Sequence, residues 1–287
     1  MAVRAPLVAA LSVALACPPR SPTPDITENS AVPAPAAAEP PSPAPPAAPD
    51  VTSLPDARQP EAPRAALEGA AQERLELPAG GSVIVAVPVG AEEPRPLVVA
   101  VHGQRDRPEW ACSGWRAVTK GRAFIVCPEG VAVGAHATGG YYWPSTTAVG
   151  RAVDRAVDAV RARFGAYVED GPMVYAGFSA GVIYGSGFVR DAGERFPLLM
   201  LSEGGYDELA SPSFAKRFRA SGGRRVLLGC SSGGCAATYE RARKLLDAAG
   251  VAARVNDAGN VGHNLDAPVV RSLQRDWPWL VEGEPGW

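Results

Sequence analysis

Short apolar runs alternate with longer helical stretches from Leu75 to the end of the chain. The run LVVAV at 97–101 is apolar at every position, which is typical of a strand buried on both faces. Further strands are expected at 82–88, 123–127, 172–176, 197–201, 225–229 and 252–256, and helices at 113–122, 147–164, 180–190, 236–249 and 265–280. This order predicts an α/β fold with a mostly parallel sheet covered by helices on both faces.

The first 64 residues do not fit this pattern. They hold 16 of the 29 prolines and no Trp, Tyr or Phe, so they cannot build a core. Removing 64 of the 287 residues leaves 223, which suits a single domain. We therefore predict a signal peptide at 1–16, a disordered Ala/Pro-rich tether at 17–72 and a folded α/β domain at 73–287. The Ala-rich stretch at 64–73 is also compatible with a short helix.

The first 16 residues have the character of an export signal. Arg4 precedes an apolar stretch that ends in small residues before Cys17 and is too short to span a bilayer. Cys17 has two interpretations: the lipidated first residue of a bacterial lipoprotein attached to a membrane, or a chance residue in a secreted or periplasmic protein. Its position at the cleavage point favours the lipoprotein, although Ala14 stands where such signals usually carry Leu.

Four cysteines remain after Cys17, and an even number in an exported chain suggests two disulfides. Three connectivities are open. Cys230 and Cys235 bracket a short Ser-Ser-Gly-Gly loop and are expected to pair, which leaves Cys112 with Cys127. A zinc site is disfavoured because the spacings are wrong and no His lies nearby. The net charge of −2 provides no electrostatic footprint for nucleic acid.

The residues that directly follow strands are the candidates for function, because ligands bind at the carboxyl ends of parallel strands. Gly177 to Gly181 read GFSAG between a predicted strand and a predicted helix. This G-x-S-x-G pattern places a nucleophile on a tight turn, where small flanking residues let strand and helix approach. Ser179 is the predicted nucleophile. The amides of Ala180 and of Gln104, which follows another strand, are the predicted oxyanion hole.

A serine nucleophile needs a base, and the chain has three histidines. His263 lies in a loop after the last strand and before the last helix, where it can reach Ser179. His102 is expected to shape its own loop, and His136 in a Gly/Ala loop is expected to be structural.

With these motifs in order, the chain resembles the α/β-hydrolase superfamily, especially exported esterases of the polyhydroxybutyrate-depolymerase or feruloyl-esterase type. The resemblance covers about Leu75 to Trp287 and rests on VVAVHG, GFSAG and GHNLD. It implies an eight-stranded sheet, ester or amide hydrolysis through an acyl-enzyme, and no metal or organic cofactor.

One departure concerns the acid of the triad. In the family it usually follows the strand that is RVLLG here, but the residues after that strand are CSSGGC, which contain no carboxylate. Some members place the acid one strand earlier, and that strand ends at Ser202 and Glu203. Glu203 is therefore the first candidate for the acid and Asp207 the second. The competing interpretation is that Glu203 is only a solvated surface carboxylate. Asp257 and Asp266 are expected to form hydrogen bonds within the histidine loop.

Aromatic residues in the nearby loops suggest a substrate rim, with core packing as the alternative. Trp110, Tyr142 and Trp143 are the candidates. The sequence thus predicts an exported serine hydrolase acting on small-molecule or polymeric carboxylic esters. Two alternatives stay open: a serine peptidase of the same fold, and a non-catalytic surface lipoprotein that binds a ligand or partner.

Overall fold

The computed structural model describes residues 64–134 and 139–287. The predicted signal peptide, Cys17, most of the predicted tether and His136 lie outside the described residues. Leu67 packs in the core and its amide donates a hydrogen bond to the carbonyl of Ala91 at 2.8 Å. The packed chain therefore begins before the predicted domain boundary at residue 73.

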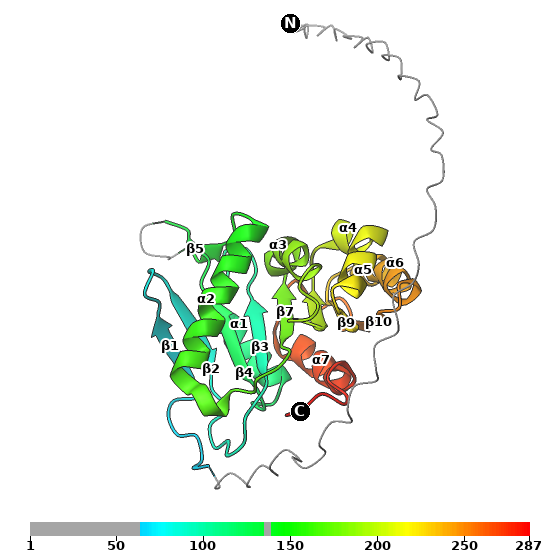
Figure 1. Ribbon diagram of the computed structural model, residues 1–287. Helices are drawn as coiled ribbons and strands as arrows, with labels where there is room; N and C mark the ends of the chain where they lie inside the picture. Colours follow the sequence, from blue (N-terminus) through cyan, green and yellow to red (C-terminus); the bar gives the residue numbers. More distant parts are fainter. Residues whose placement is uncertain (1–63, 135–138) are drawn as a thin grey trace, which may run out of the picture. The chain divides into compact units, whose positions relative to one another are not determined.

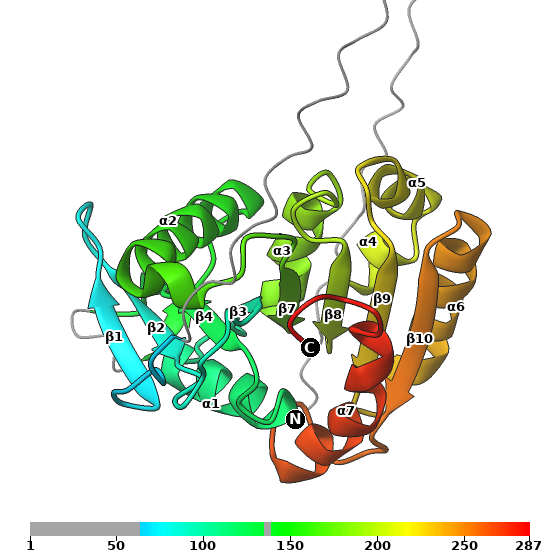
Figure 2. The ribbon, with the colours of Figure 1, turned by 60° about the horizontal axis from the view of Figure 1, so that its bottom comes forward.

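A twisted eight-stranded sheet forms the centre of the fold (Figures 1 and 2). Its strands run in the order β1-β2-β4-β3-β7-β8-β9-β10. β2 is antiparallel to both β1 and β4, and every other neighbouring pair is parallel. The strands are β1 (Gln72–Glu76), β2 (Ser82–Ala86), β3 (Leu97–Val101), β4 (Phe124–Pro128), β7 (Val174–Phe178), β8 (Leu198–Ser202), β9 (Arg225–Cys230) and β10 (Ala252–Asp257). The predicted, mostly parallel sheet of eight strands is confirmed.

Helices cover both faces of the sheet. On one face α2 (Thr146–Phe164), α3 (Ala180–Val189) and α6 (Cys235–Ala248) enclose a core rich in valine and phenylalanine. On the other face α1 (Pro108–Val118) and α7 (Ala267–Leu280) pack against the sheet, with Trp115 and Trp277 in contact between them. The central strands are buried along their whole length, which explains why they show no alternation in the sequence.

Two predictions about local structure are wrong. The segment 64–73 is not a helix, and its last two residues belong to β1. β1 is an edge strand with the sequence QERLE, so no alternation of apolar and polar residues marks it as a strand. The helix expected at 113–122 begins earlier, at Pro108, because proline is favoured in a first helical turn. That helix ends at Val118, before Lys120 and Gly121 adopt the left-handed conformation. The hairpin of β5 (Val131–Ala132) and β6 (Tyr141–Tyr142), η1 (Gly165–Tyr167), α4 (Tyr206–Leu209) and α5 (Pro212–Ala220) were not predicted.

Two disulfides link neighbouring elements, and both pairings agree with the expected ones. Cys112 on α1 is joined to Cys127 on β4. Cys230, the last residue of β9, is joined to Cys235, the first residue of α6. Within the described ranges, no helix combines the length and apolar character needed to cross a membrane.

Candidate active site

Ser179 occupies a sharp turn between β7 and α3. Its backbone is in an unusual conformation, with φ of 52° and ψ of −113°. Its amide donates to the carbonyl of Ser202 at 2.9 Å, which ties the turn to β8. A Cβ at position 181 would lie 2.1 Å from the carbonyl oxygen of Val101, so only glycine lets α3 approach β3 this closely. The packing thus holds Ser179 at the carboxyl end of the sheet, as the motif predicts.

The structure brings Ser179, His263 and Glu203 together from three separate elements. His263 Nε2 lies 2.9 Å from Ser179 Oγ, and His263 Nδ1 lies 3.1 Å from Glu203 Oε2. The imidazole is half-exposed, whereas the Glu203 side chain is fully buried. This chain of hydrogen bonds has the connectivity of a serine hydrolase triad, with a hydroxyl, an imidazole and a carboxylate in series.

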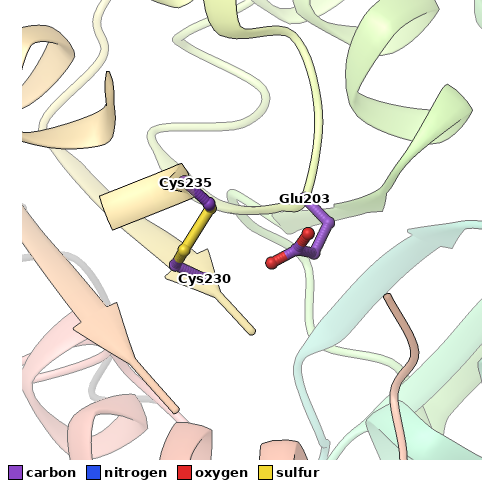
Figure 3. A group of neighbouring side chains, drawn as sticks. All are labelled: Glu203, Cys230 and Cys235. Atoms are coloured by element: carbon purple, nitrogen blue, oxygen red, sulfur yellow. A yellow bond between two sulfur atoms is a disulfide. The ribbon is translucent and has the colours of Figure 1, made fainter. Parts of the chain in front are cut away.

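Glu203 directly follows β8 and sits beside the Cys230–Cys235 disulfide (Figure 3). Its backbone has a φ of 60°. Burial raises the pKa of the carboxyl, but hydrogen bonds from Ser232, Ser231 and His263 outweigh that effect and hold the pKa below its ordinary value. The carboxylate therefore stays ionised at neutral pH, which lets it hold the imidazole and stabilise its protonated form.

The lowered pKa of Glu203 predicts a pH-dependent contribution to stability. Since the folded-state pKa lies below that of the unfolded chain, the contribution is fully present above the unfolded value and is lost as the pH falls through the folded value. We expect the unfolding free energy of Glu203→Gln to fall less than that of the wild type between about pH 7 and about pH 3. Urea unfolding at a series of pH values measures the two slopes, and equal slopes would contradict the prediction.

The other predicted acid does not reach the site. Asp207 is exposed on α4, and within the part of the chain that the structure describes no hydrogen bond or ion pair joins it to His263. Asp257 accepts a hydrogen bond from the amide of Gly259 at 2.8 Å, within its own loop as expected. Asp266 precedes α7 and lines the cleft beside His263, without a side-chain hydrogen bond to the start of that helix.

The two amides predicted to bind an oxyanion flank Ser179. Ala180 is the first residue of α3, so its N–H has no acceptor within the helix. Gln104 follows β3, and a Cβ on the preceding Gly103 would come within 3.3 Å of Ser179 Cβ. No hydrogen bond from either amide is present among the described residues. Gln104 lines the same cleft as Ser179, and the assignment of the two amides as an oxyanion hole stays a prediction.

The loop after β3 is held by β6. The amide of Arg105 donates to the carbonyl of Tyr141 at 2.8 Å, and the amide of Tyr141 donates to the carbonyl of Asp106 at 2.9 Å. His102 is buried, and its Nδ1 lies 2.8 Å from the carbonyl oxygen of Gly103. Burial lowers the pKa of His102, so the imidazole stays neutral. His102 has the loop-shaping place expected of it.

The prediction that Trp143 belongs to a substrate rim is wrong. Trp143 is 2% exposed, stacks against the His102 ring with centroids 4.7 Å apart, and donates from Nε1 to the carbonyl of His102 at 3.0 Å. Trp143 therefore packs against the loop after β3 and holds His102 in place. Tyr142 is half-buried on β6 and does not line the cleft at Ser179. An aromatic residue near a strand end cannot be assigned to rim or core from its position alone.

A cleft of about 620 Å³ opens at Ser179 and His263. Trp110 on α1, which is 63% exposed, lines the cleft together with the residues between His263 and α7. Trp110 is thus the one predicted rim residue that lines the cleft. Its indole offers an apolar surface beside the nucleophile.

Glu203, Cys230 and Cys235 form a group whose potential metal-ligating atoms lie within 4.8 Å of one another. The two sulfur atoms are joined in a disulfide, so neither is available as a thiolate. The donors around Glu203 occupy the carboxylate oxygens. In this oxidised form the group does not fit a metal ion.

Sequence reasoning missed Ser231 and Ser232, which surround the Glu203 carboxylate. The loop that contains them was noted for lacking an acid. The sequence carries no signal for this contact, because it forms only where the ends of β8 and β9 lie side by side.

Comparison with known proteins supports the fold assignment. Neither the family models nor the curated proteins include a match. Among solved structures, S-formylglutathione hydrolase from Staphylococcus aureus is 12% identical with a TM-score of 0.53, over 77% of this chain and 99% of that one. A ferulic acid esterase is 15% identical with a TM-score of 0.52, over 73% and 96% of the two chains. Esterase PE8 is 18% identical with a TM-score of 0.50, over 72% and 100%. The chain has the α/β-hydrolase fold that these enzymes share.

Proposed function

We propose that this protein is a serine hydrolase that cleaves carboxylic esters through an acyl-enzyme. The observation that carries the proposal is the hydrogen-bonded series from Ser179 through His263 to Glu203, at the mouth of a cleft. The fold shared with esterases supports it.

The geometry suggests a two-step reaction. His263 Nε2 removes the proton from Ser179 Oγ as this oxygen attacks the ester carbonyl. The oxyanion that forms accepts hydrogen bonds from the amides of Gln104 and Ala180. His263 then gives the proton to the departing alkoxide, which leaves as an alcohol. A water molecule, activated by the same imidazole, releases the carboxylic acid and restores Ser179.

Glu203 bears on the choice between enzyme and binding protein. The non-catalytic alternative drew its support from the missing carboxylate after β9. Glu203 supplies a buried, ionised carboxylate from β8 instead and contacts His263 at 3.1 Å. This arrangement favours an enzyme. The serine peptidase alternative shares the same triad chemistry and is separated from the esterase by substrate tests.

We also propose that the protein is exported, either as a lipoprotein of the bacterial cell envelope through Cys17 or as a secreted or periplasmic enzyme. The signal-like first 16 residues and the two disulfides support export, because disulfides persist in oxidising compartments.

A fluorophosphonate probe tests the proposed function. We expect the folded protein to be labelled at Ser179, identified by peptide mapping, and to hydrolyse p-nitrophenyl esters of short or long acids. Ser113→Ala removes another hydroxyl that lines the cleft and should leave labelling intact. Folded protein that is neither labelled nor active on any ester would contradict the proposal, and cleavage of peptides alone would favour the peptidase.

A further inference from the structure

We propose that Ser231 and Ser232 are positioning residues that hold Glu203 and the His263 loop in register, and that the Cys230–Cys235 disulfide keeps them in place. This inference rests on the proposed function. The four residues 231–234, which lie between the two cysteines, are called the serine loop below.

The serine loop surrounds the acid with hydrogen-bond donors. Glu203 Oε1 accepts from the amide of Ser232 at 3.1 Å and from the amide of Ser231. Glu203 Oε2 accepts from the hydroxyl of Ser232, and His263 Nδ1 lies 3.1 Å from that same oxygen. The Ser232 hydroxyl thus occupies one side of the oxygen that faces the imidazole. The other side is left for His263.

The serine loop also holds the base. The carbonyl oxygen of Ser231 accepts from the amides of Val261 and Gly262 at 2.9 and 3.0 Å. The Ser231 hydroxyl lies 2.8 Å from the carbonyl of Gly262 and 3.1 Å from Glu203 Oε1. Ser231 therefore contacts both the acid and the residue that precedes His263.

The buried carboxylate depends on these donors. An ionised carboxylate without water is strongly unfavourable unless hydrogen bonds replace its hydration. The donors in the serine loop lower the pKa of Glu203 despite its burial. Removing one of them should let the carboxyl accept a proton at a higher pH. A protonated carboxyl no longer stabilises the imidazolium that forms during the reaction.

The disulfide closes the serine loop at its two ends. Cys230 ends β9 and Cys235 begins α6, with Cα atoms 5.7 Å apart. From α6, the hydroxyl of Tyr239 lies 2.9 Å from both the amide nitrogen and the carbonyl oxygen of Gly204, the residue after Glu203. The disulfide thus joins the strand that precedes the serine loop to the helix that holds the backbone beside the acid.

Three serine variants test the positioning role. Ser232→Ala removes the hydroxyl that donates to Glu203 Oε2 and is expected to lower kcat about 10- to 100-fold with little change in KM, the range found when a hydrogen-bond partner of a metal-ligating side chain is removed. Ser232→Thr keeps a hydroxyl and should recover most of that loss. Ser211→Ala removes the hydroxyl oxygen that accepts from the amide of Ser213 at the start of α5, and among the described residues this hydroxyl makes no hydrogen bond to Glu203. It should lower stability and leave kcat unchanged.

The pH dependence separates positioning from a purely structural role. If Ser232 keeps Glu203 ionised, the ratio of wild-type to Ser232→Ala kcat should increase as the pH falls from about 8 to about 5. A structural role predicts a constant ratio among folded molecules. Fluorophosphonate labelling counts the competent sites, so unfolded protein does not distort kcat.

The disulfide has a matched control in the same chain. Cys230→Ala with Cys235→Ala should lower kcat per labelled site, whereas Cys112→Ala with Cys127→Ala should mainly lower the melting temperature. Active wild type with unchanged kcat and pH profile in Ser232→Ala would overturn this inference and leave the proposed function standing. Inactive wild type that the probe does not label would instead contradict the proposed function.

Discussion

Ser179→Ala is expected to lower kcat for ester hydrolysis about 10⁶-fold, the scale on which triad serines act in other hydrolases. The substitution removes the atom that attacks the carbonyl, and the remaining rate comes from the oxyanion amides and substrate binding. Stopped assays with p-nitrophenyl esters at high enzyme concentration measure the residual rate. Labelling by the fluorophosphonate probe should be lost.

A double variant sharpens this prediction. Ser179 and His263 act as one unit across 2.9 Å, so Ser179→Ala combined with His263→Ala should be hardly slower than either single variant. Additive losses would mean that the two side chains contribute independently, which would contradict the proposed triad. A melting temperature near that of the wild type shows that the loss comes from chemistry.

Glu203→Gln should lower kcat about 10⁴-fold, as expected when the acid of a triad becomes neutral. An amide has a single acceptor oxygen, and Glu203 faces donors on both sides: the amides of Ser231 and Ser232 at Oε1, and the Ser232 hydroxyl and His263 at Oε2. One donor must therefore lose its partner, whichever way the amide turns. The imidazole loses its compensating charge in either orientation, and it also loses the acceptor that orients it when the amide nitrogen faces Nδ1.

Asp207→Asn is the matched control for this substitution. It neutralises the other carboxyl that the sequence nominated, which is exposed on α4. We expect kcat to remain at the wild-type value. A large loss in Asp207→Asn with full turnover in Glu203→Gln would reverse the assignment of the acid and leave Ser179 and His263 as a pair.

The parts of the fold that were predictable share a strong local signal. Buried strands such as 97–101 are apolar without interruption, and the small residues around Ser179 exist because the strand and helix touch there. β1 was missed because an edge strand of charged residues has no such signal. α4 and α5 are short helices that tertiary packing stabilises more than their sequences do.

The candidate site residues were predicted from their positions along the chain, directly after predicted strands. Ser179 and His263 follow strands, and Glu203 follows the strand beside the one expected to carry the acid. What the sequence could not supply is the contact between neighbouring strand ends. The serine loop contacts Glu203 because β8 and β9 are neighbours in the sheet, and the sequence does not give that pairing. Trp143 was misassigned for the same reason, since its packing against His102 depends on the fold of β6.

The disulfide between Cys112 and Cys127 has a consequence for how the proposed hydrolase should lose activity on heating. It spans 15 residues and attaches α1, the helix that carries Trp110, to the sheet. In the chain-entropy account, closing a loop of that length raises the free energy of the unfolded state by about 3 kcal/mol. The α1 side of the cleft therefore stays covalently attached to β4 when non-covalent contacts loosen. Thermal inactivation should begin on the side of the cleft formed by the histidine loop, where no covalent link holds the chain to its neighbours among the described residues.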